Sequence, residues 1–233
     1  MARDFTKDIA NYMALGVNKI GPLLNGASAI SLSAIVTFDT QTGGANNNRV
    51  VSFSIGTATG GLIGLSATPF KLRIGGRSVT TEAFEAKNGT TTIATGTEYV
   101  VGGVLDIGGD AIRVYLDGVQ ETSTAVTFDN ATYTQGSPTG NDMIGAAGSP
   151  PADTNEQVDG RISEVAIWNA DITTAGFAML ADRFSPAMVR PDALVAYWKL
   201  LGRYSPEPDI VGGVSGTITG TVAQAVHPRM IYP

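Results

Sequence analysis

Alternation of apolar and polar residues with a period of two recurs along this chain and limits what it can fold into. In residues 29–38, Ile30, Leu32 and Phe38 fall on one side of an extended strand, and serine and threonine fall on the other. Successive side chains of a strand point to opposite faces, so this pattern predicts a half-buried strand. Apolar-in, polar-out strands are typical of antiparallel sheets. The same pattern recurs at 51–55, 70–74 and 112–116.

Glycine-rich turns separate these predicted strands. Glycine accounts for 29 of the 233 residues, and clusters such as 43–48 interrupt the alternation. The sharpest turn signal is Asp117-Gly118, which stands between two apolar strands. A two-residue Asp-Gly loop favours a type I′ hairpin, because both turn positions need a positive φ. The chain is therefore expected to be all-β.

One segment, 173–184, departs from the strand pattern. Phe177, Leu180 and Phe184 recur at helical spacing, Asp171 or a threonine is placed to cap the start, and Pro186 follows the end. These features predict one short helix on the surface. The chain is expected to divide into a mostly irregular N-terminal arm or edge segment at 1–27, a β-sandwich at 28–224 and a C-terminal arm at 225–233.

Charge and composition narrow the classes of molecule that the protein is expected to bind. The chain has 15 basic and 21 acidic side chains, a formal charge of −6, and no basic run, which disfavours nucleic acid. It has no cysteine, so disulfides and thiol chemistry are excluded. Residues 1–8 carry charges where a signal peptide would be apolar, and no run of roughly 20 apolar residues is present. We expect a protein made in a cytoplasm, without a membrane partner.

The order of several motifs resembles a known family. A strand at 99–101 precedes the 112–119 hairpin, then come Ile144-Gly145 and the segment 159–169 with its Ile-Trp-Asn ending. Together they resemble the laminin-G/concanavalin A-like domains over residues 28–200. The resemblance implies a two-sheet antiparallel jelly-roll sandwich with one short helix.

The end of the chain carries a second resemblance. The segments 194–200, 205–209 and 227–233 resemble the tail of laminin-G-like proteins encoded in tailed-phage genomes. This resemblance implies that the chain is a component of a phage virion.

Catalysis is not expected. Glycosidases on this fold place paired carboxylates in an E-x-D-x-x-E motif on one strand, and the chain lacks that motif. The nearest pair, Asp159 and Glu164, is five residues apart, which predicts opposite faces of a strand. A Ser-His-Asp triad would need His227, the sole histidine, near the C-terminus. We therefore expect no catalytic residues and no enzyme activity.

Metal binding is also disfavoured, with calcium left as the alternative. The resembled family includes domains that bind Ca²⁺ through loop carboxylates and carbonyls. Acidic residues of this chain do fall in predicted loops, but none forms a dense set of ligands, and an aspartate that caps its own turn is the ordinary explanation. We expect no metal and no cofactor. The calcium candidates are Asp39, Asp106, Asp110, Asp129, Asp142, Asp153 and Asp159.

Sugar binding needs an exposed aromatic ring as a stacking platform. Most aromatic residues fall at apolar strand positions, and Tyr133 is the one loop aromatic placed to stack on a glycan. Tyr133 is therefore the candidate for a glycan-binding reading.

The function favoured by the sequence is structural. Low charge, many small polar residues and a proline-punctuated tail fit a subunit built into a larger assembly, because proline-containing ends do not extend a sheet. We expect a non-enzymatic capsid decoration or cement protein of a phage virion, oligomeric and bound to the major capsid protein. The alternative is a glycan-binding module of a tail or fibre; an extracellular adhesin is disfavoured because no signal segment is seen. The expected partner-binding residues are His227, Arg229, Ile231 and Tyr232.

Overall fold

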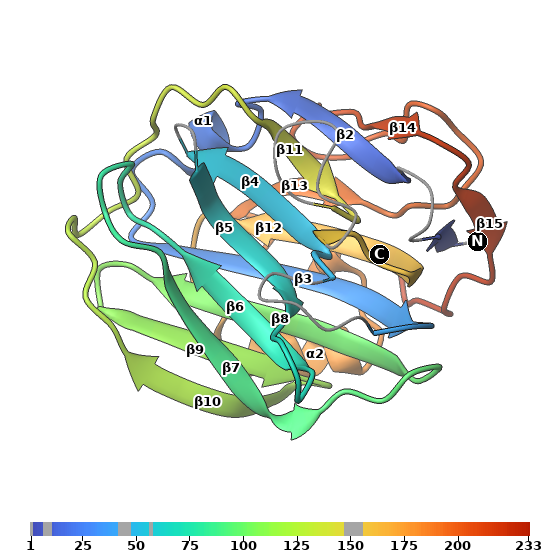
Figure 1. Ribbon diagram of the computed structural model, residues 1–233, viewed down its shortest axis with the longest axis horizontal. Coiled ribbons are helices and arrows are strands. Elements are labelled where there is room, and N and C mark those ends of the chain that lie inside the picture. Colours follow the sequence, from blue (N-terminus) through green and yellow to red (C-terminus); the bar gives the residue numbers. More distant parts are fainter. Residues whose placement is uncertain (1, 7–10, 42–47, 56–57, 147–155) are drawn as a thin grey trace.

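Two antiparallel β-sheets face each other across one hydrophobic core in the computed structural model, which describes residues 2–6, 11–41, 48–55, 58–146 and 156–233 (Figure 1). The sandwich predicted from the alternation is thereby confirmed. Among the described residues, no helix is long and apolar enough to cross a membrane.

Sheet A has eight strands. Its order is β10 (Val119–Ala125), β9 (Ala111–Leu116), β8 (Glu98–Asp106), β3 (Ala29–Phe38), β12 (Gly160–Trp168), β1 (Ala2–Phe5) and β15 (Ala223–Ala225), with β13 (Leu194–Trp198) also paired to β12.

Sheet B has seven strands. Its order is β14 (Thr217–Thr219), β2 (Tyr12–Val17), β11 (Asn141–Ile144), β4 (Val51–Ile55), β5 (Ala58–Leu65), β6 (Lys71–Gly76) and β7 (Glu85–Thr92).

The alternating residues fill the space between the sheets as predicted. Ile112, Val114 and Leu116 of β9 are all buried in this core. The prediction that 29–38 is half buried is wrong, however, because all ten residues of β3 are buried. A second apolar cluster covers the outer face of sheet A, where Phe177 stacks on Tyr115 with ring centroids 4.0 Å apart. The polar residues of β3 are thus covered by segments far away in the sequence.

The turn and helix signals are confirmed in position. Asp117 and Gly118 both have positive φ, 47° and 78°, between β9 and β10. Helix α2 (Thr173–Ala181) occupies the predicted helical segment and lies beside β8 and β10. The prediction that Asp171 or a threonine is the N-cap is wrong, because that position is Ile172; Asp171 precedes it, and its carboxylate accepts the N–H of Thr173 at 2.7 Å. The other helices are short: α1 (Gly21–Leu24) and a 3₁₀ helix (Pro186–Met188).

The expectation of mostly irregular structure at 1–27 is wrong. This segment contributes β1 to sheet A, between β12 and β15, and β2 to sheet B, between β14 and β11. Asn11 and Gly16 do not prevent this, because Asn11 lies just before β2 and a register shift between Asp142 and Met143 of β11 accommodates Gly16. The first strand of the chain, β1, pairs with the last, β15 (Figure 1).

Candidate functional site

The C-terminal arm, residues 225–233, lies on the outer side of sheet A of its own chain. The N–H of Ile231 donates to the carbonyl of Arg183, and the N–H of Ser185 donates to the carbonyl of Ile231, both at 2.8 Å. These bonds form a parallel bridge between Ile231 and Phe184. The arm therefore docks on the segment that follows α2 rather than continuing a sheet.

Beneath the arm lies a polar cluster, built on the buried Glu164 and Tyr197, that we call the Glu164 centre: Glu164, Tyr197, His227 and Tyr232. A bulge in β12 between Ser163 and Ala166 turns Glu164 to the outer face, with a positive φ of 54°. Its carboxylate accepts from the Tyr197 hydroxyl and, at 3.1 Å, from the Tyr232 hydroxyl. The Nε2 atom of His227 lies 2.9 Å from the same carboxylate. Strand β12, strand β13 and the arm thus converge on one acid.

Hydrogen bonds and burial fix the side chains of this centre. His227 has only oxygen acceptors around it, because Nδ1 lies 2.7 Å from the Pro228 carbonyl and Nε2 lies 3.2 Å from the Lys199 carbonyl. The ring therefore links Glu164 to the backbone carbonyls of Pro228 and Lys199. Burial raises the pKa of the Tyr197 phenol, and the Glu164 carboxylate raises it further. Both effects, in the same order, raise the pKa of Tyr232. The centre is saturated with donors and anchors the arm.

The triad considered for His227 does not form among the described residues. The histidine faces Glu164 and two carbonyls, while the Ser185 hydroxyl lies 3.2 Å from that of Tyr197 instead. A nucleophile would need the imidazole within hydrogen-bond reach.

A groove runs beside the arm on the same outer face, and we call it the sheet A groove. Sheet A supplies its floor and the arm supplies one wall. Glu98 at one side is paired with Arg183 at 2.8 Å, and Arg161 stands opposite Asp4 of β1 in the strand register. The lining thus combines a carboxylate, a guanidinium and hydroxyl groups with apolar side chains. The lining residues include Ile35, Thr37, Glu98, Arg161, Ser163 and Pro228.

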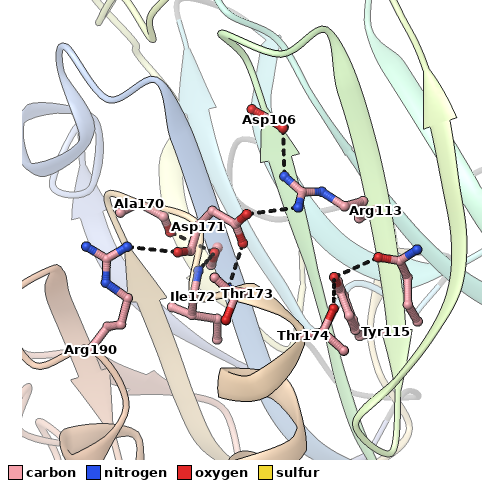
Figure 2. A network of polar contacts seen from close by, with 11 residues as sticks. Asp106, Arg113, Tyr115, Ala170, Asp171, Ile172, Thr173, Thr174 and Arg190 are labelled. Atoms are coloured by element: carbon pink, nitrogen blue, oxygen red, sulfur yellow. Dashed lines mark hydrogen bonds and ion pairs between the residues drawn. The ribbon is translucent and has the colours of Figure 1, made fainter.

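A second polar network joins α2 to the sheet (Figure 2). Arg113 of β9 lies between two carboxylates, donating to Asp106 at 2.7 Å and to Asp171 at 2.8 Å. Arg190 donates to the carbonyl of Asp171, and the Tyr115 hydroxyl lies 3.2 Å from that of Thr174. This network holds the start of α2 against β9, so its carboxylates serve the fold.

Most of the calcium candidates have similar internal partners. Asp110 accepts the N–H of Phe128, and Asp142 accepts three backbone N–H groups, from Lys19, Ile20 and Ser54. Within the described ranges, no three His, Asp or Glu side chains are grouped as a metal site requires. Asp153 lies outside the described residues.

Asp39 and Asp159 are near each other at one end of the sandwich, with Asp4. Burial raises the pKa of Asp4, the charges of Asp39 and then Asp159 also raise it, and Arg161 opposes them. The Thr40 hydroxyl donates to Asp159. The expectation of no metal stays a prediction.

Tyr133 is wrongly predicted as an exposed platform. Its side chain is 1% exposed, and its ring packs edge-on against Phe53, with centroids 6.0 Å apart. The cause is a pair of backbone bonds, to Ala27 and from Gly26, that fold this loop onto the 25–27 turn. No face of the ring is available for a sugar.

Sequence reasoning missed a second polar region, the Asn48–Arg49 corner, defined by Asn48, Arg49 and Glu156. Both side chains of the Asn48–Arg49 pair are buried. Within the described part of the chain, the polar atoms of the Asn48 amide and Nη1 of Arg49 have no hydrogen-bond partner. The one available signal was an arginine directly before a buried strand, where a charged residue needs a partner.

No curated protein matches the chain. A putative carbohydrate-binding protein from Bacteroides ovatus is similar over 96% of this chain, with a TM-score of 0.67 and 18% identity. The chain spans 59% of the length of that protein.

Two further solved structures share the fold at lower identity. The SAP-like pentraxin of Limulus polyphemus is similar over 73% of this chain and 75% of its own, with a TM-score of 0.56 and 14% identity. The CBM40 domain of the Ruminococcus gnavus IT-sialidase, solved with α2,3-sialyllactose, is similar over 73% and 91%, with a TM-score of 0.53 and 8% identity. The family model described as the concanavalin A-like lectin/glucanases superfamily matches residues 10–175. The chain belongs to the concanavalin A-like lectin/glucanase superfamily.

Proposed function

We propose that the protein is a non-catalytic glycan-binding module that holds a sugar in the sheet A groove. The observation that carries the proposal is the placement of Glu98 and Arg161, which pair with Thr37 from the strands on its two sides, beside Val226 and Pro228 of the arm. Support comes also from the family and from the names of similar structures, a putative carbohydrate-binding protein and a carbohydrate-binding module solved with a sialylated sugar.

The chemistry of the groove suits a hydroxyl-rich ligand. A sugar hydroxyl both donates and accepts, so Glu98 and Arg161 on the two sides of the groove can bond neighbouring hydroxyls of one ring. Val226 and Pro228 on the arm offer contact to the apolar face of the ring.

We also propose that the module does not hydrolyse the glycan it binds. Glu164 is buried and bonded by two phenols and one imidazole, so it has no free position for a substrate proton. Asp159 lies with Asp4 and Asp39 rather than with Glu164. General acid–base hydrolysis of a glycoside requires two carboxyl groups that flank one bond.

The virion role expected from the sequence stays a prediction. The arm that was expected to contact a capsid protein is docked on its own chain. Val226, Ile231 and Tyr232 remain exposed on it, and they are the side chains it would present to a neighbouring subunit.

A glycan array followed by titration tests the proposal. We expect binding to at least one glycan, weakened about tenfold or more by Arg161→Ala and by Glu98→Ala, because each removes an accessible polar group from the groove. Arg203→Ala is the matched control, because Arg203 is exposed outside the groove, and it should bind like the parent. Absence of binding to any glycan, or equal binding by all variants, would sink the proposal, as would hydrolysis of the bound glycan.

A further inference from the structure

The Asn48–Arg49 corner is built by two segments that meet at one end of sheet B. The N–H of Arg49 donates to the carbonyl of Glu156 at 3.2 Å. Val50 and Val158 are both linked to Gly145, at the end of β11, by backbone bonds of 2.9 Å. The backbone of the corner is therefore firmly held, and it carries its side chains in fixed places.

Asn48 is fully buried, yet its side chain bonds to nothing in the described part of the chain. Neither the amide nitrogen nor the amide oxygen has a partner. Its φ of 52° is one that asparagine tolerates better than most residues, which fixes where the amide stands. A buried polar group without a partner is rare in native proteins, and such a group is often matched by a bound ligand, ion or water.

Arg49 is a second buried residue of the corner with an unpartnered polar atom, and its side chain is a guanidinium. Its side chain is about nine-tenths buried, and Nη1 has no partner while Nη2 lies 3.6 Å from the Glu156 carboxylate. Burial lowers the pKa of this guanidinium, the Glu156 charge raises it, and the neighbouring Arg73 charge lowers it again. Like charges side by side are favourable only with a compensating negative charge.

Arg73 lies close enough to the corner for its charge to act on Arg49. It stands on β6, opposite Gly64 of β5 in the strand register. Burial lowers the pKa of Arg73 as well. Two partly desolvated guanidiniums thus share one region of sheet B with the Asn48 amide.

We propose that the Asn48–Arg49 corner is a subsite for the acidic group of a glycan, a carboxylate or a sulfate ester. Arg49 Nη1 and the Asn48 amide nitrogen donate to the oxygens of the acidic group. The Asn48 amide oxygen accepts from a hydroxyl or an N–H of the same sugar. An acidic sugar carries both kinds of group, whereas a free inorganic anion carries only the first. The proposal rests on the proposed glycan-binding function and adds a second position to it, on the other sheet.

Titrations followed by backbone amide NMR test the subsite. The probes are sodium acetate and sodium sulfate at constant ionic strength, trigalacturonic acid, its neutral methyl ester and a sulfated disaccharide. We expect saturable shifts around residues 48–50 with an acidic sugar and none there with the methyl ester. Acetate and sulfate show whether the corner binds a carboxylate or a sulfate group in the absence of a sugar.

Substitutions separate the subsite from general charge effects. Arg49→Met should weaken binding of the acidic sugar about tenfold or more, and Arg49→Lys should weaken it less, because lysine keeps the charge but loses the guanidinium fork. Asn48→Gly suits the positive φ and removes the amide, so it should weaken binding too. Arg203→Met removes the same charge from an exposed position and should change nothing. Thermal unfolding shows that each variant is folded before it is titrated.

The outcomes distinguish this inference from the proposed function. One outcome is glycan binding that depends on Arg161 but is equal for acidic and esterified sugars and unchanged by Arg49→Met. This outcome would overturn the subsite and leave the proposed glycan-binding function intact. Binding of acetate or sulfate that depends on Arg49, with no glycan bound by any variant, would overturn the glycan assignment of both sites. Absence of any saturable shift at residues 48–50 overturns the subsite.

Discussion

The Glu164 centre and the Asn48–Arg49 corner are both buried and polar, but they differ in how their polar atoms are matched. At the centre, one carboxylate receives two phenols and an imidazole. At the corner, three buried polar atoms of Asn48 and Arg49 receive nothing from the described chain. A matched network stabilises a fold, whereas unmatched buried groups lower its stability until a ligand meets them. We read the first as a structural anchor and the second as a binding site.

The largest expected effect comes from removing the acid of the anchor. Glu164→Ala leaves two phenols and an imidazole without their shared partner, and loss of one partner of a buried hydrogen-bonded charge costs about 3 to 5 kcal/mol. Urea unfolding of the variant measures this. Glu121→Ala is the control, because its carboxylate also accepts two backbone N–H groups, but in exposed contacts. Equal losses for both variants would contradict the role of Glu164 as the buried anchor.

Deleting residues 226–233 tests the same anchor from its other side. The deletion removes His227 and Tyr232 and leaves Glu164 with the Tyr197 hydroxyl as its side-chain donor. We expect a loss of about 2 kcal/mol, which corresponds to a fall of roughly 4 to 8 °C in Tm for a chain of this size. Tyr232→Phe, which removes a single donor, should fall between the parent and the deletion. An unchanged Tm would show that the arm contributes nothing to the fold.

The strands were predictable because burial between two sheets requires an uninterrupted pattern. The segments 29–38 and 51–55 match β3 and β4 at both ends, and Asp117-Gly118 forms the turn that its positive φ angles allow. The burial of both faces of β3 was not predictable, because α2 and the arm cover it from more than a hundred residues away. Local alternation shows which side chains face a core but not what covers the other face.

The site residues were less predictable for the same reason. Tyr133 looked exposed because its neighbours are polar, but backbone bonds to the 25–27 turn bury it. His227 and Tyr232 were singled out as contacts to another protein, and the structure places them on Glu164, which was considered separately as a catalytic candidate. Their convergence depends on a bulge in β12, and the residue pattern carries no sign of it.

Alkaline pH should weaken the anchor and spare the corner. The pKa of Tyr197 is raised in the folded state, so above about pH 10 the unfolded chain releases this proton while the folded chain keeps it. The free energy of unfolding should therefore be constant below that pH and then fall, by up to about 1.4 kcal/mol per pH unit for each retained proton. Urea unfolding at several pH values measures the slope. Tyr197→Phe should flatten the slope, whereas Tyr204→Phe, at an exposed phenol, should not.

The smallest expected effect on stability is at the corner. Asn48→Gly removes an amide that bonds to nothing in the described chain, and glycine adopts the φ of 52° without strain. The loss of buried polar atoms without partners offsets the added freedom of the unfolded glycine, so the free energy of unfolding should change by less than about 1 kcal/mol. Asn11→Gly is the contrasting variant, because Asn11 is equally buried but bonds through its side chain to Thr6 and Thr221. A loss at Asn48 as large as at Asn11 would mean that the Asn48 amide stabilises the fold, and the corner would then be an anchor like the one at Glu164.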